Sequence, residues 1–545
     1  MAKEATAKTA ETLAKEQRAI SVSEFFEKNR HLLGFDNPTK ALLTVVKEAV
    51  DNSLDACEEA RILPDVKVII KPLEENVFRV TIEDNGPGIV KQQIPHIFAR
   101  LLYGSKFGRG KQSRGQQGIG ISAAVLYSQL TTGKPAIIYS KPDKNKKTHM
   151  VELKLDTTKN EPKILKEEDL EDGLKHTGTK IILEIQGKYI QSKHSVDEYM
   201  RQTAIMNPHA NIRYENAAGE KSDWKRTVDK LPPLPKEIKP HPHGVEMGIL
   251  ERMAHNTDSR TVANFMQNDF CRVGSTSAEE MCRLAGIAPN AKPRELTSEQ
   301  VRKLYDAIQK VKLMRPPTDC LAPIGEKMLE EGLKNETKAE FVNAVTRDPV
   351  VYRGNPFQIE AAIAYGGDLA KTQSGEVASD EAVQQPAKLI RYANKMPLLY
   401  EQSSCALTKA VQGVTWRRYG MNQPGGGLPH GPAVIAVHIC STWVPYTSEG
   451  KEAIASYPEI IEEIKLAVQE VARSLFQYVS GIRKTEDRAK RQKLFEVYIP
   501  ELAGDLAHLT GEKKEKMEEG LKKFLKKNVA KIIEEGGDNG EAAKE

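Results

Sequence analysis

Two glycine-rich segments lie close together in the first quarter of this chain of 545 residues. In the first, a strand-like run ends at Asp84, and Gly86 and Gly88 follow. In the second, residues 114–120 read RGQQGIG and open an apparent helix. Glycine lets a backbone pass close to a planar ligand, and the free N–H groups at a helix N-terminus suit phosphate. Either segment alone could be an ordinary turn, so neither predicts a ligand by itself.

A helix is predicted just before these segments, over residues 39–61. Its apolar residues recur at helical spacing and form one stripe: Leu42, Leu43, Val46, Val50 and Leu54. Glu48, Asn52 and Asp55 fall together on the opposite face. Such a polar face is often merely solvated, and the neighbouring glycine segments give it a possible function. Strands are expected at 66–71, 77–83, 136–140, 150–155 and 179–185, which makes an α/β sandwich.

In this order and spacing, the three motifs resemble the N-box and the two glycine boxes of the gyrase, chaperone, histidine kinase and MutL (GHKL) ATPases. The resemblance implies a Bergerat-type α/β sandwich that binds ATP and Mg²⁺. It makes Glu48 the general base for the attacking water and Asn52 an oxygen ligand of Mg²⁺. Asp84 would accept a hydrogen bond from the adenine amino group, and Gly86 and Gly88 would give the base room.

The resemblance also assigns supporting residues. Thr179 matches the threonine that supports the aspartate in these ATPases. The phosphate lid would be formed by Gly115, Gln116, Gln117, Gly118, Ile119 and Gly120, assisted by Ser105 and Lys106.

Proline-rich breaks divide the chain into several domains, as its length requires. We expect an α/β multi-domain protein in which a lead-in (1–21) precedes the ATPase domain (22–235). A helical module (243–314) follows, with capping boxes at Ser277/Glu280 and Thr297/Gln300 and a helix end at Gly286. An α/β domain (318–500) carries a long helix after Pro458, and a charged tail (501–545) ends the chain.

The helical module resembles the helix-two-turn-helix module of DNA topoisomerase VI B subunits. Three further runs are similar to that family: 103–107, 394–400 and 422–426. The resemblance implies the ATPase subunit of a type IIB topoisomerase, which relaxes and decatenates double-stranded DNA as an A2B2 heterotetramer. Two B subunits would dimerise on ATP binding and signal through a transducer domain to a separate A subunit that cleaves DNA.

One motif departs from the family. Its transducer carries Trp-Lys-x-Tyr, whose lysine reaches the γ-phosphate, whereas residues 416–419 here read WRRY. We predict that Arg417 replaces this lysine, with Lys409 and Arg418 as alternatives. DNA contacts are expected from scattered cations: Lys106, Arg109, Lys111, Arg114, Arg252, Arg260 and Arg272. The apolar residues near 494–499 would dock onto another chain.

Bulk composition indicates a cytoplasmic protein, and the resemblance to topoisomerase VI B subunits implies association with the nucleoid. The chain lacks a run of about 20 apolar residues that could span a membrane. Its six cysteines lie far apart, which argues against disulfides and a zinc site. The net charge of +5 neither requires nor excludes a polyanionic partner.

Three alternatives remain open. A MutL-like repair ATPase would lack the helical insertion. A meiotic B-like scaffold would bind nucleotide without turnover, although Glu48 argues against it. A protein kinase would need a phosphoacceptor histidine segment, and none is evident.

Overall fold

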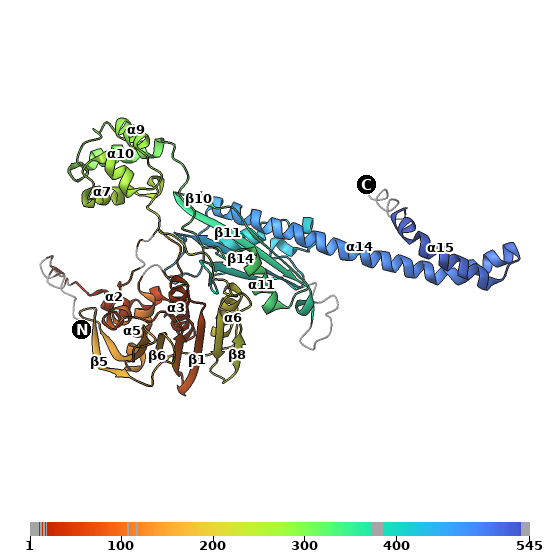
Figure 1. Cartoon of the computed structure of the whole chain (residues 1–545), viewed down its shortest axis with the longest axis horizontal. Helices are drawn as coiled ribbons and strands as arrows, with labels where there is room; N and C mark the ends of the chain where they lie inside the picture. The colour runs from red at the N-terminus through yellow and green to blue at the C-terminus, as the bar shows by residue number, and fades with distance from the viewer. Residues whose placement is uncertain are drawn as a thin grey trace, which may run out of the picture. The chain divides into compact units, whose positions relative to one another are not determined.

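A computed structural model describes residues 10, 13–14, 17, 19–105, 108, 110–115, 118–371 and 385–535. The chain divides into two units. The first comprises the residues up to Trp416 together with 421–471, and the second comprises 417–420 and the residues from Ala472 onward. The predicted α/β multi-domain fold is confirmed, because two mixed sheets and a separate helical module occur along the described chain (Figure 1).

The first sheet has eight strands in the order β5-β4-β3-β6-β2-β1-β7-β8. The strands are β1 (Asp65–Glu74), β2 (Val77–Asp84), β3 (Ala136–Lys141), β4 (Thr148–Asp156), β5 (Glu161–Leu170), β6 (Gly178–Gln186), β7 (Asn211–Glu215) and β8 (Lys221–Trp224). The five predicted strands are confirmed as β1, β2, β3, β4 and β6. Strands β5, β7 and β8 were not predicted. All pairs are antiparallel except β1 with β7.

Helices cover one side of this sheet (Figure 1). They are α2 (Val22–Lys28), α3 (Pro38–Glu59), α4 (Ile94–Ala99), α5 (Gly120–Thr132) and α6 (Val196–Met206), and short 3-10 turns η1 (Arg30–Leu33) and η2 (Lys91–Gln93) join them. Alternate residues of β2 point into the shared core, among them Val80 and Ile82. This packing brings the end of β2 beside α3 and α5.

Helix α3 forms where the apolar periodicity predicts it. Its N-terminus is capped by the Asn37 side chain, which accepts a hydrogen bond from the Lys40 N–H at 2.8 Å. Pro38 occupies the first turn, where its missing N–H costs nothing. The predicted stripe is fully buried, and each such side chain stabilises the fold by roughly 1.5–3 kcal/mol. The helix is therefore a rigid platform for its polar face.

The helical module contains α7 (Met247–Asn256), α8 (Val262–Asp269), α9 (Ser275–Ala285) and α10 (Ser298–Lys310), with the short turns η3 (Pro242–Gly244) and η4 (Pro293–Glu295). The Thr297/Gln300 capping box is confirmed, and Gly286 ends α9 with φ +66. The Ser277/Glu280 box is wrong, because α9 begins at Ser275 and Gly274 is its N-cap. Ser277 therefore lies inside the first turn.

The second sheet has six strands in the order β10-β11-β14-β12-β13, with β9 paired to β11. They are β9 (Phe341–Thr346), β10 (Val350–Tyr352), β11 (Asn355–Tyr365), β12 (Lys388–Ala393), β13 (Met396–Pro397) and β14 (Ala433–Ser441). Helices α11 (Glu326–Thr337) and α13 (Ala406–Gln412) and the short turns η5 (Gly367–Ala370), η6 (Trp416–Tyr419) and η7 (Pro424–Gly426) complete this region. Every residue of β14 is buried.

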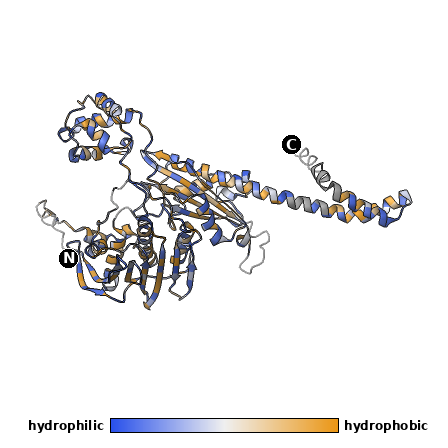
Figure 2. Ribbon diagram, in the orientation of Figure 1, coloured by the Kyte–Doolittle hydropathy of each residue, from blue (hydrophilic) through white to orange (hydrophobic). Residues whose placement is uncertain are grey.

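The long helix predicted after Pro458 is α14 (Pro458–Thr510), and α15 (Lys514–Glu535) follows it. The buried apolar residues of α14 are Ile460, Ile464, Ala467, Val468, Val471, Ala472, Leu475, Ile499 and Ala503. Figure 2 shows hydrophilic and hydrophobic residues interleaved along α14. Within the described ranges, no helix has both the length and the apolarity to cross a bilayer.

Candidate functional site

A cavity of about 330 Å³ lies where α3, the end of β2, the second glycine segment and residues 449–452 meet. This volume is in the range of small-molecule sites. Ten of the predicted site residues line it: Glu48, Asn52, Asp84, Gly88, Ser105, Gly115, Gly118, Ile119, Gly120 and Thr179. Gly86 is buried directly beside Asp84. Lys106, Gln116 and Gln117 lie outside the described residues.

Asp84 is fixed at the end of β2 by three donors. Its carboxylate accepts hydrogen bonds from the Ser53 hydroxyl at 2.9 Å, the Gly86 N–H at 2.9 Å and the Thr179 N–H at 3.2 Å. Burial raises the pKa of Asp84, although these three donors act in the opposite direction. Thr179 thus supports Asp84 through its backbone, and the carboxylate is held in one orientation.

Two glycines allow the backbone to approach closely around Asp84. Gly178 packs against the Asp84 carbonyl, where an added Cβ would lie 1.9 Å from the oxygen. Gly88 has φ +68, and a Cβ there would lie 2.6 Å from the Lys141 carbonyl oxygen. A larger residue at either position would push this wall of the cavity out of place.

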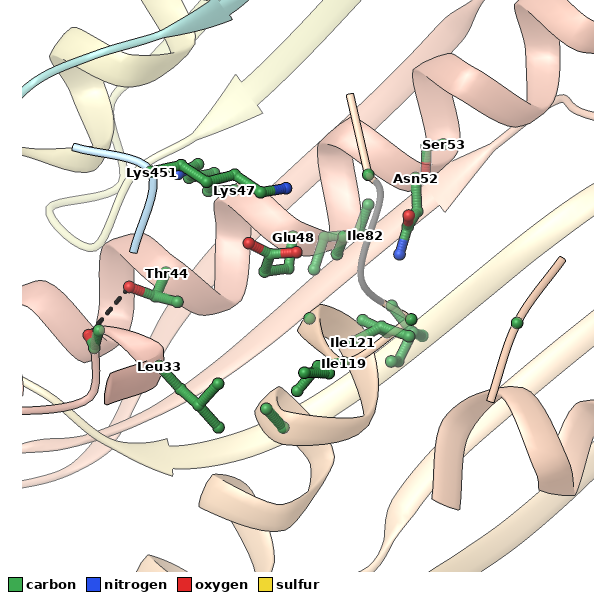
Figure 3. Close-up of a pocket in the computed structure, with 18 of the residues that line it drawn as sticks. Leu33, Thr44, Lys47, Glu48, Asn52, Ser53, Ile82, Ile119, Ile121 and Lys451 are labelled. Carbon is green, nitrogen blue, oxygen red and sulfur yellow. Dashed lines mark hydrogen bonds between the residues drawn. The ribbon is translucent and has the colours of Figure 1, made fainter. Parts of the chain in front are cut away.

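Glu48 lies against the first residue of α5. A Cβ added to Gly120 would fall 1.7 Å from the Glu48 Oε2 atom, so glycine is needed at this position. Figure 3 shows Glu48 and Asn52 projecting from α3 into the cavity, opposite Ile119 and Ile121. The carboxylate is therefore placed at a helix N-terminus, the end that favours negative charge. Phosphate would be favoured in the same region.

Lysine side chains supply positive charge beside Glu48. Lys451 is 8% exposed, and its Nζ donates to the Arg114 carbonyl oxygen at 3.1 Å. Lys47 donates to the Gly450 carbonyl oxygen at 3.3 Å, and burial lowers the pKa of Lys47. Figure 3 labels the two side chains beside each other, and the charge of Lys451 also lowers the pKa of Lys47. Lys451 was not among the predicted site residues, because Gly450-Lys451 alone is too short to be a motif.

The predicted phosphate sensor belongs to the second unit of the chain, whereas the residues that line the cavity belong to the first. Arg417 is exposed on η6 and does not belong to the lining residues. The alternatives Lys409 and Arg418 are likewise exposed and absent from the lining, and Lys409 donates to the Ser456 hydroxyl at 2.8 Å. The role assigned to Arg417 stays a prediction.

Arg114 was expected to be a surface cation for DNA, but it is only 3% exposed. Its guanidinium donates to Asp55 at 2.8 Å, Glu58 at 2.7 Å and Asn207 at 2.6 Å. Asp55 therefore binds Arg114 instead of facing the cavity with Glu48. Burial alone would raise the pKa of Glu58, but the charges of Arg114 and Lys395 hold it well below its usual range.

A second cluster, Glu360, His438 and Cys440, has ligand types that could hold a metal, and all three residues are buried. Glu360 already accepts from the N–H groups of Ile324 and Gly325 at 2.9 and 2.7 Å, and it contacts His438 Nδ1 at 2.8 Å. The other His438 nitrogen accepts from the Lys395 N–H at 2.8 Å. The hydrogen bonds of this cluster are satisfied, so it is a structural network.

Two family models match the chain. Residues 37–159 match the family described as histidine kinase-, DNA gyrase B-, and HSP90-like ATPase. Residues 316–492 match the topoisomerase VI B subunit transducer. The two matched regions contain all the segments that line the cavity, apart from Leu33, Gly34, Phe35, Thr179, Ile181 and Tyr199.

Several curated relatives cover most of the chain. The type 2 DNA topoisomerase 6 B subunit of Methanosarcina barkeri is 47% identical over 501 residues, which is 92% of this chain and 79% of the relative. The protein of the same name from Methanosarcina acetivorans is 48% identical over 501 residues, with the same coverage. That of Pyrococcus furiosus is 38% identical over 578 residues, which covers 97% of this chain and 98% of the relative.

Proposed function

This chain belongs to the family of type 2 DNA topoisomerase 6 B subunits, and we propose that its cavity binds and hydrolyses ATP to drive DNA strand passage. It combines the ATPase domain and the transducer domain of that family. The observation that carries the proposal is the convergence of Glu48, Asp84 and the second glycine segment on one cavity. The cavity has one carboxylate at each end, Glu48 and Asp84, and glycine backbone between them. This arrangement suits a nucleoside triphosphate.

We assign the groups of ATP to the two ends of the cavity. The adenine amino group donates to Asp84, whose buried carboxylate is already oriented by Ser53, Gly86 and Thr179. The phosphates lie at the N-terminus of α5, where Gly118 and Gly120 leave the backbone accessible. Lys451 reaches them from the transducer domain.

Glu48 is the general base in this proposal. Its carboxylate lies at the α5 N-terminus, so a water beside the terminal phosphate would be within its reach. Lys451 and the helix dipole stabilise the negative charge that develops on the transferred phosphoryl group. Both effects require that the cavity place the phosphates at Gly120.

Mg²⁺ fits the residues present. Asn52 offers a hard oxygen ligand one helical turn from Glu48, and Mg²⁺ commonly takes one or two protein ligands together with phosphate and water oxygens. When bound, the ion would neutralise charge on the phosphates. The side chain of Asn52 would hold and orient it on the α3 side of the cavity.

We further propose the assembly implied by the family. Two chains dimerise when ATP closes the second glycine segment, and a separate A subunit cleaves the DNA duplex. Exposed apolar side chains near the end of α14 support a docking surface for that subunit: Leu494, Phe495, Val497 and Tyr498. Ile499 is buried and does not belong to this surface. The assembly would act on the nucleoid.

Supercoil relaxation tests the proposal directly. Purified chain is mixed with an A subunit of the family and supercoiled plasmid, and ATP is compared with a non-hydrolysable analogue. We expect repeated relaxation only when the A subunit and ATP are both present. Relaxation that is equally fast without ATP would contradict an ATP-driven mechanism. ATP binding without any turnover would instead favour the non-hydrolysing scaffold.

A further inference from the structure

A two-residue turn in the second sheet has an unusual sequence for its backbone. Asn394 and Lys395 join β12 to β13, and both have positive φ, +47 and +69. Turns of this kind favour glycine at the second position, since a Cβ is strained there. The other two-residue hairpin of the same sheet joins β10 to β11 through Arg353-Gly354, and it does have glycine at that position.

The lysine side chain is buried at the end of this strained turn. Lys395 is 4% exposed, and its Nζ lies 2.9 Å from Glu58 Oε2 on α3. The Asn394 amide donates to the Ser113 carbonyl at 3.1 Å and to the Ser441 carbonyl at 2.9 Å. The turn therefore contacts both α3 and the residues just before the second glycine segment.

Glu58 joins this turn to the cavity. Its Oε1 atom accepts from Arg114 Nη2 at 2.7 Å and contacts His209 Nε2 at 3.1 Å. Arg114 directly precedes Gly115, and its carbonyl oxygen holds Lys451. The buried side chains of Lys395 and Arg114 and the partly buried side chain of Glu58 thus form a chain of charges from the β12–β13 turn to two parts of the nucleotide cavity.

A contribution to folding stability does not by itself explain the buried Lys395–Glu58 ion pair. Burying an ion pair costs desolvation, and apolar residues of similar size often stabilise a protein as well or better. Here the ion pair also requires a lysine in a backbone conformation that disfavours side chains. The contacts of Glu58 with Lys395 and Arg114 hold the β12–β13 turn at a fixed position relative to Arg114. A change in the position of one can therefore be transmitted to the other.

We propose that Lys395 is a positioning residue that couples the second glycine segment to the second sheet through Glu58 and Arg114. A nucleotide held at Gly115 and Gly120 alters how Arg114 is held, and Glu58 passes this change to the β12–β13 turn. Lys395 does not touch the nucleotide. This inference rests on the proposed function, because it takes ATP as the ligand of the cavity.

The test compares three variants of the full chain. Lys395→Met removes the ammonium group and keeps much of the side-chain volume. Lys395→Gly removes the same group and introduces the residue that the turn backbone favours, so a shared effect cannot come from a misfolded turn. Lys338→Met is the control, because Lys338 is also a lysine with positive φ (+47) but is exposed.

Two quantities are measured for each protein: the affinity for a non-hydrolysable ATP analogue, and hydrogen exchange with and without it in residues 388–396, which do not line the cavity. We expect wild type and Lys338→Met to show slower exchange there when the analogue is bound. Both Lys395 variants should bind the analogue within about threefold of wild type but lose the nucleotide-dependent difference.

The outcomes separate the two proposals. Lys395 variants that keep the full nucleotide-dependent difference would overturn the coupling role and leave the proposed function standing. Faster exchange in both states, with the difference preserved, would show a purely structural role and also overturn it. A wild-type chain that binds no analogue would refute the proposed function and this inference together.

Discussion

Among single residues, Asp84 has a carboxylate that is held in one orientation by neighbouring donors. Burial opposes ionisation of its carboxyl group, and hydrogen bonds from Ser53, Gly86 and Thr179 support it. A buried polar group is costly unless all its partners are present. The remaining hydrogen-bonding capacity of this carboxylate is directed at the cavity, where the adenine amino group is proposed to bind.

Asp84→Asn should therefore weaken ATP binding. The amide replaces one acceptor oxygen with a donor that faces existing N–H groups, and loss of a hydrogen bond to a charged group costs about 1.5–3 kcal/mol, or roughly 10- to 100-fold in affinity. Titration with a fluorescent ATP analogue measures this change. Asp306→Asn, on the exposed face of α10, is the matched control. Equal affinities for the two variants would refute the adenine assignment.

Lys451 and Arg417 are two candidates for the side chain that contacts the terminal phosphate, and a substitution at each distinguishes them. Lys451 lines the cavity, so Lys451→Met should lower the ATP turnover number by about 100-fold, as expected when a charge stabiliser is removed. Arg417→Met tests the other assignment in the same assay, because Arg417 is the sensor that the sequence predicts. Steady-state ATPase assays decide between them. A loss of turnover in Arg417→Met but not in Lys451→Met would support Arg417 as the phosphate sensor.

Asp51 predicts a pH dependence of stability. It is buried, its Oδ1 accepts from the Tyr199 hydroxyl at 3.0 Å, and burial raises its pKa from 3.8 to about 6. Between these values the folded chain holds this proton and the unfolded chain has released it, so the contribution to stability falls as pH rises from about 4 to 6. Above that window, the folded protein carries a buried charge.

Asp51→Asn should remove this dependence. The melting temperature of wild type, relative to the variant, is expected to be higher at pH 5 than at pH 7.5. Differential scanning fluorimetry of both proteins across this range gives the comparison. A difference that is constant with pH would show that Asp51 does not titrate as its burial predicts.

At the scale of elements, α5 and α3 meet at a contact that only glycine allows. Gly120→Ala would place a Cβ where the Glu48 carboxylate lies, so Glu48 must move. We expect ATP turnover to fall by about 100-fold, within the range for loss of a positioned base, with the fold retained. Gly248→Ala, in α7 with no heavy atom within 4 Å of the new Cβ, is the control. Equal turnover for both variants would contradict the placement of Glu48.

Sequence patterns predicted the elements whose signal is local. Helix α3 and strand β2 have regular apolar periodicity, so both were found close to their true ends. Strand β5 was missed because it is an edge strand whose residues are mostly exposed and charged. The β12–β13 turn was missed because Asn394-Lys395 lacks the glycine that usually marks such a turn.

Part of the candidate site was predictable, because several of its residues belong to local sequence motifs. Glu48, Asn52 and Asp84 belong to compact motifs on neighbouring elements, and these converge as expected. Lys451 comes from a loop about 400 residues away from Lys47 in the sequence, although both line the cavity. No local sequence pattern indicates that Lys451 belongs to the site. The buried state of Arg114 also depends on partners that are distant in sequence. Contacts between residues so far apart in the sequence can be identified only from the folded structure.

At the scale of the whole molecule, the cavity joins two regions of the chain that the family matches separately. The ATPase region supplies Glu48 and Asp84, and the transducer region supplies Lys451. Hydrolysis at this cavity can therefore change contacts in both regions at once. This is the physical basis for ATP-driven strand passage in the proposed assembly with an A subunit.

If this cavity binds ATP and Glu48 activates the attacking water, the loss of the Glu48 carboxylate should abolish hydrolysis and spare binding. The most direct measurement is ATP turnover and ATP affinity of Glu48→Gln, assayed side by side with wild type. We expect affinity within about threefold of wild type and turnover reduced by about 100-fold or more, because the phosphate cradle remains and the base is lost. Turnover close to that of wild type would contradict this role of Glu48.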